Sequence, residues 1–341
     1  MSDTPNEATT EHEDILEPDL PICDPHHHLW HFPTSRYLLE DLLADIGPGD
    51  GPGGHKVEST VFVECTAFYR LRGPEPMKVV GETEFVAGVA AMADSGYYGP
   101  VRACEGIVGR ADLCLGKAVD EVLKAHIVAA GGRFSGIRHA GGWDAIGAIR
   151  NSHTDPPEDL YLEPEFRAGF ARLAPNGLTF EAWQYHPQLP DVLDLARAFP
   201  GTPIMLNHVG GPLGIGPYAG RRDEVFTTWR EGIRNLGACP NVWVKLGGLG
   251  MAVYGFEFHR REPRPGSAKI AEAWRPYIET CIEAFGTDRG VFESNFPVDK
   301  VSCSYNTLWN VFKHITSGAS AEEKARLYRD NARAFYRLGV S

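Results

Sequence analysis

The sequence predicts an α/β protein that folds as a single (β/α)₈ barrel, and three observations support this class. Strand-like and helix-like segments alternate along the 341 residues until they give about eight pairs. The strand-like segments are apolar without alternation, as in residues 59–65, which is typical of parallel strands buried on both faces. No linker or change of composition divides the series. We therefore expect one barrel over residues 19–341, preceded by a short flexible tail over residues 1–18.

The elements follow in order from this pattern. Residues 1–18 are acidic and polar, which favours disorder, and a first strand is expected within residues 22–30. A short helix over 37–46 then leads into a Gly/Pro-rich loop over 47–54. The spacing of Ser320 and Glu323 indicates a capping box before a last helix, whose apolar stripe packs on the core. Between these limits the expected strands are 59–65, 103–109, 134–139, 178–186, 203–208, 242–246 and 290–295, and the expected helices are 82–94, 115–129, 165–174, 189–199, 224–237 and 268–285.

Charge and cysteine content exclude several classes of protein. The net charge of -12 and the absence of a basic run disfavour binding to nucleic acid or to anionic membranes. Neither a long uncharged apolar stretch nor a basic-then-apolar leader is present, so we expect no membrane span, no signal peptide and a cytoplasmic location. The 7 cysteines are scattered without CxxC spacing, which indicates reduced thiols rather than disulfides or a zinc ribbon.

One short segment concentrates chemically useful side chains. If residues 22–30 form a strand, His26 and His28 point to the same face, and His27 points to the other. Two imidazoles at this spacing can share a metal ion or flank a bound substrate.

In a (β/α)₈ barrel the active site lies at the carboxyl ends of the strands, so the last residues of each predicted strand are informative. Alternation puts Phe180 and His186 on one face of the fifth strand, and Ile204 and His208 on one face of the sixth. Both patterns predict a histidine at the rim above apolar residues. The polar strand ends that we expect to meet at the mouth are His26, His28, Glu64, Arg138, His139, Tyr185, His186, Asn207, His208, Lys245, Glu293 and Asn295.

Five of these segments carry a family resemblance. Residues 24–30 (DPHHHLW), 136–139 (GIRH), 185–189 (YHPQL), 207–212 (NHVGGP) and 292–297 (FESNFP) resemble, in order, motifs of the amidohydrolase-related family of the amidohydrolase superfamily. The similarity runs from about residue 20 to 338, and the branch that it resembles most is that of the sugar lactonases and pyrone dicarboxylate lactonase. Jointly the motifs are specific for the superfamily, and they say little about the substrate.

The resemblance implies roles at matching positions. His26 and His28 from the first strand and His186 from the fifth would be ligands of a divalent metal ion, zinc or manganese. His208 would polarise the scissile carbonyl or assist proton transfer. The family's last strand usually ends Ser-Asp-Phe-Pro or Ser-Asp-Trp-Pro, with an aspartate that ligates the metal or acts as general base. The matching residue here is Asn295.

Asn295 is the main departure from the family pattern, because a neutral amide cannot take a proton from water near pH 7 and ligates zinc poorly. Three interpretations are open. A metal held by the histidines activates water itself, with His208 as base. Alternatively Glu293, Asp299 or Glu64 replaces the lost carboxylate, or the site binds without turnover. We favour the first two together, because the histidine set is intact.

Arg138 is the candidate for holding a substrate carboxylate or stabilising an oxyanion, and an ion pair with a neighbouring acid is the alternative. Long loops over 209–217 and 247–266 form either a lid over a small substrate or a contact between copies of the chain in a homo-oligomer. We expect further substrate contacts from Glu64, His139, Tyr185 and Tyr254.

These observations predict a hydrolase that opens a lactone or a similar cyclic ester of a small molecule. A non-oxidative decarboxylase of a small aromatic carboxylate on the same fold is the alternative within the enzyme class, although relatives of that kind often begin with Glu-x-His rather than His-x-His. A binding protein without catalysis is the third alternative, motivated by Asn295.

Overall fold

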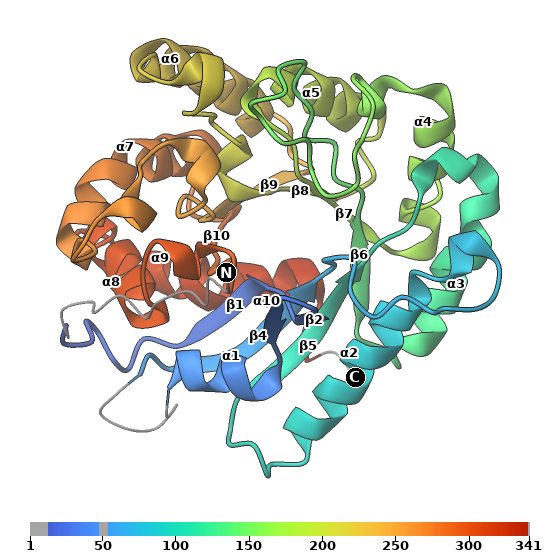
Figure 1. Ribbon diagram of the computed structural model, residues 1–341, viewed down its shortest axis with the longest axis horizontal. Coiled ribbons are helices and arrows are strands. Elements are labelled where there is room, and N and C mark those ends of the chain that lie inside the picture. Colours follow the sequence, from blue (N-terminus) through green and yellow to red (C-terminus); the bar gives the residue numbers. More distant parts are fainter. Residues whose placement is uncertain (1–12, 48–53, 340–341) are drawn as a thin grey trace.

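The computed structural model describes residues 13–47 and 54–339, and its central element is one sheet of eight parallel strands. The strands follow one another around a barrel in chain order (Figure 1). Helices lie between consecutive strands, which confirms the predicted (β/α)₈ class. The barrel strands are β1 (Ile22–His27), β4 (Val57–Val63), β5 (Arg102–Gly109), β6 (Phe134–Arg138), β7 (Thr179–Ala182), β8 (Ile204–Leu206), β9 (Val242–Leu246) and β10 (Gly290–Phe292); β2 (Trp30–Phe32) and β3 (Ser35–Tyr37) form a separate hairpin.

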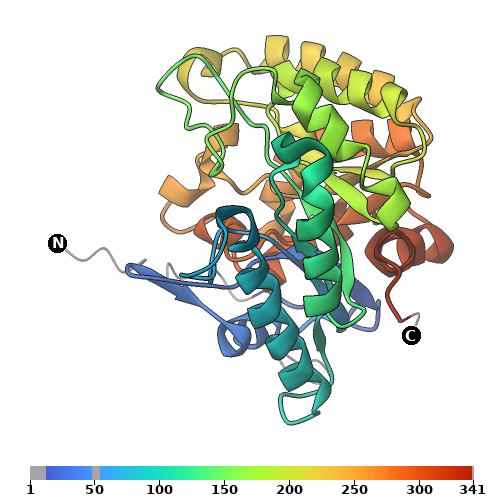
Figure 2. The ribbon, with the colours of Figure 1, turned by 90° about the vertical axis from the view of Figure 1, so that its right-hand side faces the viewer.

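Helices cover the outside of the barrel (Figure 2). The third predicted helix starts late: residues 113–118 form a 3₁₀ segment in which Gly116 has φ 57°, so the α-helix begins at Val119 rather than at 115. No helix in the described part of the chain is long and apolar enough to cross a membrane. The helices are α1 (Leu39–Ile46), α2 (Val80–Asp94), α3 (Val119–Ala129), α4 (Pro164–Phe170), α5 (Leu189–Ala198), α6 (Arg222–Gly237), α7 (Ser267–Phe285), α8 (Tyr305–Ile315), α9 (Ala321–Ala325) and α10 (Asn331–Tyr336).

The barrel closes where β1 meets the segment that follows β10. His27 and Phe296 form an isolated parallel bridge, and the backbone N–H of His28 donates to the carbonyl of Phe296 at 2.8 Å. The buried carboxylate of Asp24 strengthens this seam, since its Oδ1 accepts the backbone N–H of Ser294 at 2.9 Å. These bonds fix the His-x-His strand against the last strand of the barrel.

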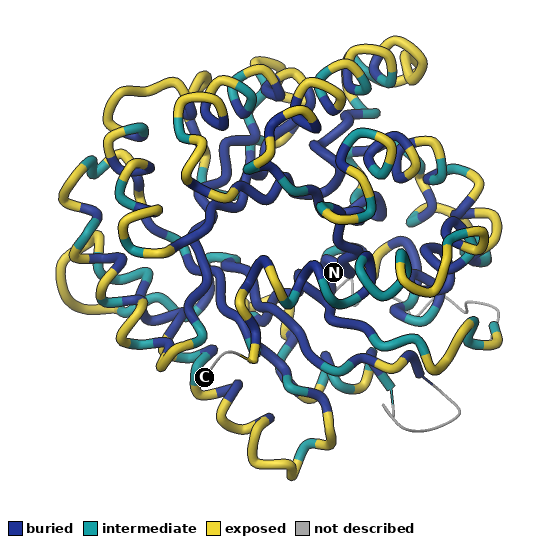
Figure 3. The backbone as a smooth tube through the Cα atoms, turned by 180° about the vertical axis from the view of Figure 1, so that it is seen from behind, coloured by how far each residue is buried: buried dark blue, intermediate teal, exposed yellow. Residues whose placement is uncertain are grey.

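The core has an outer layer between strands and helices and a smaller inner layer at the bottom of the barrel. Figure 3 shows the barrel strands mostly buried and the helices exposed on their outer sides. Met205 of β8 packs with Tyr336 of α10 in the inner layer, whereas Phe180 and Leu206 belong to the outer layer. Phe180 and Leu206 therefore face the helices. Strand alternation from these two residues does not point to His186 and His208 at the rim, contrary to the expectation.

Part of the predicted tail makes specific contacts. Residues 1–12 lie outside the described residues. Oε1 of Glu13 accepts the backbone N–H of Ser267, the first residue of α7, at 2.6 Å. The buried ammonium of Lys313 donates to the carbonyls of Leu16 and Glu17 at 2.6 and 2.9 Å. Residues 13–17 of the expected tail therefore contact α7 and α8.

The predicted capping box at the start of α9 is confirmed and gives a stability prediction. The backbone N–H of Ser320 donates to Glu323 Oε2 at 2.8 Å, and the N–H of Glu323 donates to Ser320 Oγ at 3.3 Å. Ser320→Ala leaves one helix N–H without its side-chain acceptor and should cost about 1 kcal/mol of unfolding free energy. Urea unfolding followed by circular dichroism measures the loss. Ser317→Ala, at an exposed position in the preceding loop, is the matched control and should change stability by less than about 0.5 kcal/mol.

Candidate active site at the barrel mouth

Three buried ionisable side chains meet at the carboxyl end of the barrel. Ligand-type atoms of His26, His208 and Glu293 lie within 4.8 Å of one another, and among the described residues they form the one group of three or more that could hold a metal ion. Glu293 joins the two histidines: its Oε1 lies 2.6 Å from Nδ1 of His208, and its Oε2 lies 2.6 Å from Nδ1 of His26. The first contact is a hydrogen bond, whereas Oε2 has no hydrogen-bond partner in the described part of the chain.

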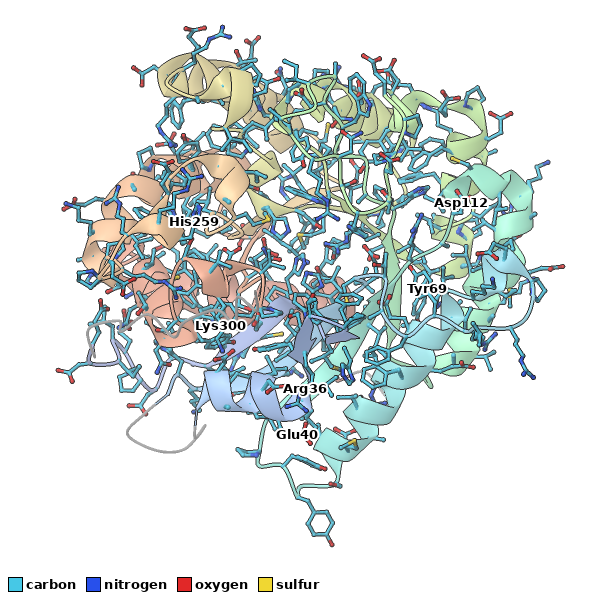
Figure 4. The ribbon with its side chains drawn as sticks, in the orientation of Figure 1. Arg36, Glu40, Tyr69, Asp112, His259 and Lys300 are labelled. Atoms are coloured by element: carbon cyan, nitrogen blue, oxygen red, sulfur yellow. The ribbon has the colours of Figure 1, made fainter. Side chains whose placement is uncertain are left out.

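Loops that follow the strands surround this group. Figure 4 labels side chains from four of them around the barrel axis: Tyr69, Asp112, His259 and Lys300. These loops come after β4, β5, β9 and β10, so they lie at the carboxyl end of the barrel, where the sequence placed the site.

His208 reaches the group through a turn in the backbone. Strand β8 ends at Leu206, and the chain then adopts positive φ at His208 (50°) and Val209 (48°). The hydroxyl of Tyr254 donates to the carbonyl of His208 at 3.3 Å. Gly248 makes room for the ring, because a Cβ there would lie 2.3 Å from Nδ1 of His208. The expected position of His208 at the rim is thus reached by this turn and not by strand alternation.

His28 adjoins the group from the other side of His26. The Nε2 atoms of the two rings are 3.2 Å apart, and Nδ1 of His28 lies 2.7 Å from the carbonyl oxygen of Val63. The His-x-His segment therefore puts both imidazoles in the mouth, as expected.

Arg138 is held in a fixed orientation beside His26. Its Nε donates to Glu64 Oε1 at 2.6 Å, and one terminal nitrogen donates to the carbonyl of Glu64 at 2.5 Å. The other terminal nitrogen lies 3.3 Å from Nε2 of His26. His153 contacts both carboxylate oxygens of Glu64 at 3.0 and 3.1 Å. Arg138 thus forms the ion pair with a neighbouring acid, Glu64, that was the alternative to a role in substrate binding. This ion pair orients the remaining edge of the guanidinium toward His26.

A second buried ion pair lies beneath the histidines. Nζ of Lys245 is 2.8 Å from Oε2 of Glu181 and 3.2 Å from Nδ1 of His26. The hydroxyl of Tyr336 donates to Oε1 of Glu181 at 2.5 Å, and the amide of Asn207 donates to Oε2. Glu181 and His153 are not among the site residues that the sequence predicts. Glu181 could have been identified from the sequence, because it is a charged residue within the apolar barrel strand Thr179–Ala182.

Asn295 and Asp299 contact each other rather than the three-residue group. Nδ2 of Asn295 donates to Oδ1 of Asp299 at 2.8 Å, and Oδ2 of Asp299 accepts the backbone N–H of Gly250 at 2.8 Å. Asp299 therefore fixes the Asn295 amide and anchors the loop after β9. Neither residue belongs to the group of His26, His208 and Glu293.

Three predicted site residues face loops instead. Strand β7 ends at Ala182, and His186 begins a 3₁₀ turn in which its Nδ1 accepts the backbone N–H of Leu213 at 3.3 Å. His186 and His28 both lie outside the three-residue group, so the group differs from the ligand set that the resemblance implies. His139 likewise accepts a backbone N–H, and the hydroxyl of Tyr185 donates to a backbone carbonyl.

Burial sets the protonation of the site. It lowers the pKa of His26, His28 and His208 well below the ordinary value, and the positive charge of Arg138 adds to the effect. The three imidazoles are therefore neutral at pH 7 and can accept a proton or a metal. Burial raises the pKa of Glu293 to about 8, although Lys245 opposes the shift. Burial also acts to raise the pKa of Glu64, but His153 and Arg138 overcome it and hold this pKa below its usual range.

The donor set fits a divalent metal ion. Two neutral imidazoles and one carboxylate are ligands that both zinc and manganese accept. Oε2 of Glu293 is buried and lies 2.6 Å from Nδ1 of His26, but the two atoms are not aligned for a hydrogen bond. Among the described residues this oxygen therefore has no hydrogen-bond donor. A cation close to this oxygen would satisfy it.

A (β/α)₈ barrel with buried histidines and a carboxylate at its carboxyl mouth defines a class of hydrolytic enzymes. Residues 23–338 match the model of the Amidohydrolase family, and the chain belongs to that family. It is a hydrolase, as the sequence motifs predicted.

Relatives and solved structures agree with this assignment. The chain is 35% identical to the uncharacterized protein y4mH of Sinorhizobium fredii, over 94% of this chain and 99% of that protein. It is 26% identical to L-fucono-1,5-lactonase of Burkholderia ambifaria, over 92% of this chain and 95% of the lactonase. Its fold resembles an amidohydrolase of Burkholderia multivorans crystallised with bound zinc, with a TM-score of 0.68, 21% identity, and coverage of 93% of this chain and 99% of the other.

Proposed function

We propose that this hydrolase opens a small lactone by adding water to its carbonyl carbon. The observation that carries the proposal is the buried Glu293–His208 hydrogen bond of 2.6 Å beside Arg138 and His26. Relatives named L-fucono-1,5-lactonase and L-rhamnono-gamma-lactonase support a lactone substrate. A cavity of about 500 Å³ lies along the loop over residues 143–155 and adjoins the site through His153, which contacts Glu64. None of His26, Arg138, His208 and Glu293 lines it.

His208 is the proposed general base. Its Nδ1 is hydrogen-bonded to Glu293, so the neutral ring has its lone pair on Nε2. This nitrogen can accept a proton from a water molecule. As water adds to the carbonyl carbon, its proton passes to Nε2 of His208, and the Glu293 carboxylate stabilises the imidazolium that results. The same proton then passes to the ring oxygen as the C–O bond breaks. Because the pKa of Glu293 is raised to about 8, Glu293 supplies the negative charge that Asn295 cannot when the pH exceeds this value, and the rate without metal should rise with pH through it.

Arg138 is the proposed electrophilic group. Glu64 occupies one edge of its guanidinium, so the remaining donor is turned to His26 before the substrate arrives. A fixed donor of this kind stabilises the oxyanion of the tetrahedral intermediate without reorganisation.

A zinc or manganese ion would be held by His26, His208 and Glu293, and when bound it would supply a Lewis acid and lower the pKa of water. A neutral imidazole has one lone pair, so His208 would be a ligand in the metal-bound site and is the base in the site without metal. His28 adjoins this set at 3.2 Å from His26. His186 is not needed by the proposal.

Substitution of two histidines separates this ligand set from the one that the family resemblance implies. His208→Ala should lose at least about tenfold in zinc affinity, because it removes one of three ligands. His186→Ala should bind zinc as the wild type does, because Nδ1 of His186 faces the backbone N–H of Leu213. Zinc titration of chelator-treated protein by calorimetry gives both values, and loss of affinity in His186→Ala alone would contradict the assignment.

A substrate panel tests the reaction class. Hydrolysis of 1,5- and 1,4-lactones of sugar acids and of 2-pyrone-4,6-dicarboxylate is followed by acid release at constant pH, with and without added zinc or manganese. In parallel, carbon dioxide release is measured from aromatic carboxylates. Acid release that is absent in His208→Ala supports the lactonase. Carbon dioxide release without lactone hydrolysis would replace it by a decarboxylase, and ligand binding without either reaction would favour a binding protein.

A further inference from the structure

Trp183 stands beside His208 with a hydrogen-bond donor that no described residue uses. Its ring centroid lies 4.7 Å from that of His208, with the two planes at 79°, so the edge of one ring meets the face of the other. The residue is only 8% exposed. An indole N–H can only donate, and among the described residues no group accepts from it.

The indole nitrogen of Trp183 is also within reach of a bound molecule. The indole nitrogen of Trp274 is fully buried without an acceptor, whereas that of Trp183 is not fully buried. Nε2 of His208 likewise has no partner in the described part of the chain and is not fully buried, since the bond to Glu293 uses Nδ1. Two ring nitrogens on adjoining side chains of the mouth are therefore both available to a substrate.

The chain holds Trp183 firmly in this place. Its backbone carbonyl accepts the N–H of Gly141 at 2.8 Å and the hydroxyl of Tyr161 at 3.2 Å. Its ring also meets the ring of Tyr185 edge to face, with the centroids 5.7 Å apart. The indole donor is thus fixed before a substrate arrives, and a hydrogen bond from it requires little reorganisation.

We infer that Trp183 contacts the substrate and donates its indole N–H to the ring oxygen of the lactone. The inference rests on the proposed function, in which the ring oxygen comes next to Nε2 of His208 as the C–O bond breaks. An ether oxygen has two lone pairs, so it can accept from both side chains at once. The indole keeps its proton throughout and stabilises the negative charge that develops on the departing oxygen. Arg138 and Trp183 would then each serve one of the two oxygens of the ester.

The test compares Trp183→Phe with the wild type on the best lactone of the panel and on its thiolactone, in which sulfur replaces the ring oxygen. Phenylalanine keeps an aromatic ring beside His208 but has no N–H donor. Sulfur is a weak acceptor, and a thiolate leaves without help from a donor. Trp243→Phe is the matched control, because Trp243 lies in the inner layer at the bottom of the barrel, where its ring packs on Phe335 with centroids 5.4 Å apart.

Trp183→Phe should lower kcat/KM on the lactone by about tenfold and on the thiolactone by less than about twofold, because only the lactone loses a hydrogen bond. The control should keep wild-type rates on both. Equal losses on the two compounds would show a packing role and overturn the inference, and so would an unchanged rate on the lactone. If Trp183→Phe does not fold, 3-benzothienylalanine in place of Trp183, which exchanges only the N–H for sulfur, gives the same comparison. A wild type that hydrolyses no lactone would instead overturn the proposed function, and this inference with it.

Discussion

Glu293→Gln is expected to lower kcat/KM by about 10²–10⁴-fold, the range for loss of general base catalysis. Glutamine keeps the shape of the side chain but cannot stabilise an imidazolium at His208, to which Oε1 of Glu293 is bonded at 2.6 Å. It also removes the one carboxylate from the group that fits a metal. Initial rates on the best lactone of the panel measure the loss, with circular dichroism as the check on folding.

Glu257→Gln is the matched control for this substitution. Glu257 lies in the loop after β9 with its side chain 59% exposed, and it pairs with Arg260 at the surface. The control should retain wild-type rates. If Glu293→Gln stays within about twofold of the wild type, the Glu293–His208 pair is not the general base system.

Arg138→Met is expected to lower kcat by about 10²–10³-fold, because the oxyanion loses a fixed donor. It should also destabilise the fold by about 3–5 kcal/mol, because Glu64 is fully buried and would keep only His153 as a charged partner. Urea unfolding and kinetics are measured on the same preparation.

The double variant Arg138→Met with Glu64→Met separates the two effects. It removes both partners of the buried pair, so much of the lost stability should return, whereas the activity should stay low. Recovery of activity in the double variant would show that Arg138 only neutralises Glu64 and takes no part in the reaction.

The barrel was predictable from the sequence because its signals are local. Runs such as Val242–Leu246 are apolar enough to identify buried strands, and the capping box of Ser320 and Glu323 fixed the start of α9. Errors arose where backbone geometry changes at the ends of strands. Strand β7 stops at Ala182, so the alternation used for His186 did not apply.

The candidate site was predictable in part. The spacing of His26 and His28 predicts that both point into the mouth, and Glu293 is one of the predicted replacements for the missing aspartate. The contact between Lys245 and Glu181 joins two barrel strands that are not neighbours, β7 and β9, and periodicity within one strand carries no information about such a pair. His153 was missed for a related reason, because it reaches Glu64 from a loop without a regular pattern.

Anomalous diffraction at the zinc edge, on crystals of wild-type protein soaked with zinc, tests the central claim most directly. We expect one strong peak within bonding distance of His26, His208 and Glu293. A peak bonded to His26, His28 and His186 would instead support the ligand set implied by the family resemblance. The absence of a peak, together with lactone hydrolysis that resists chelators, would contradict the metal site and leave the Glu293–His208 pair as the base.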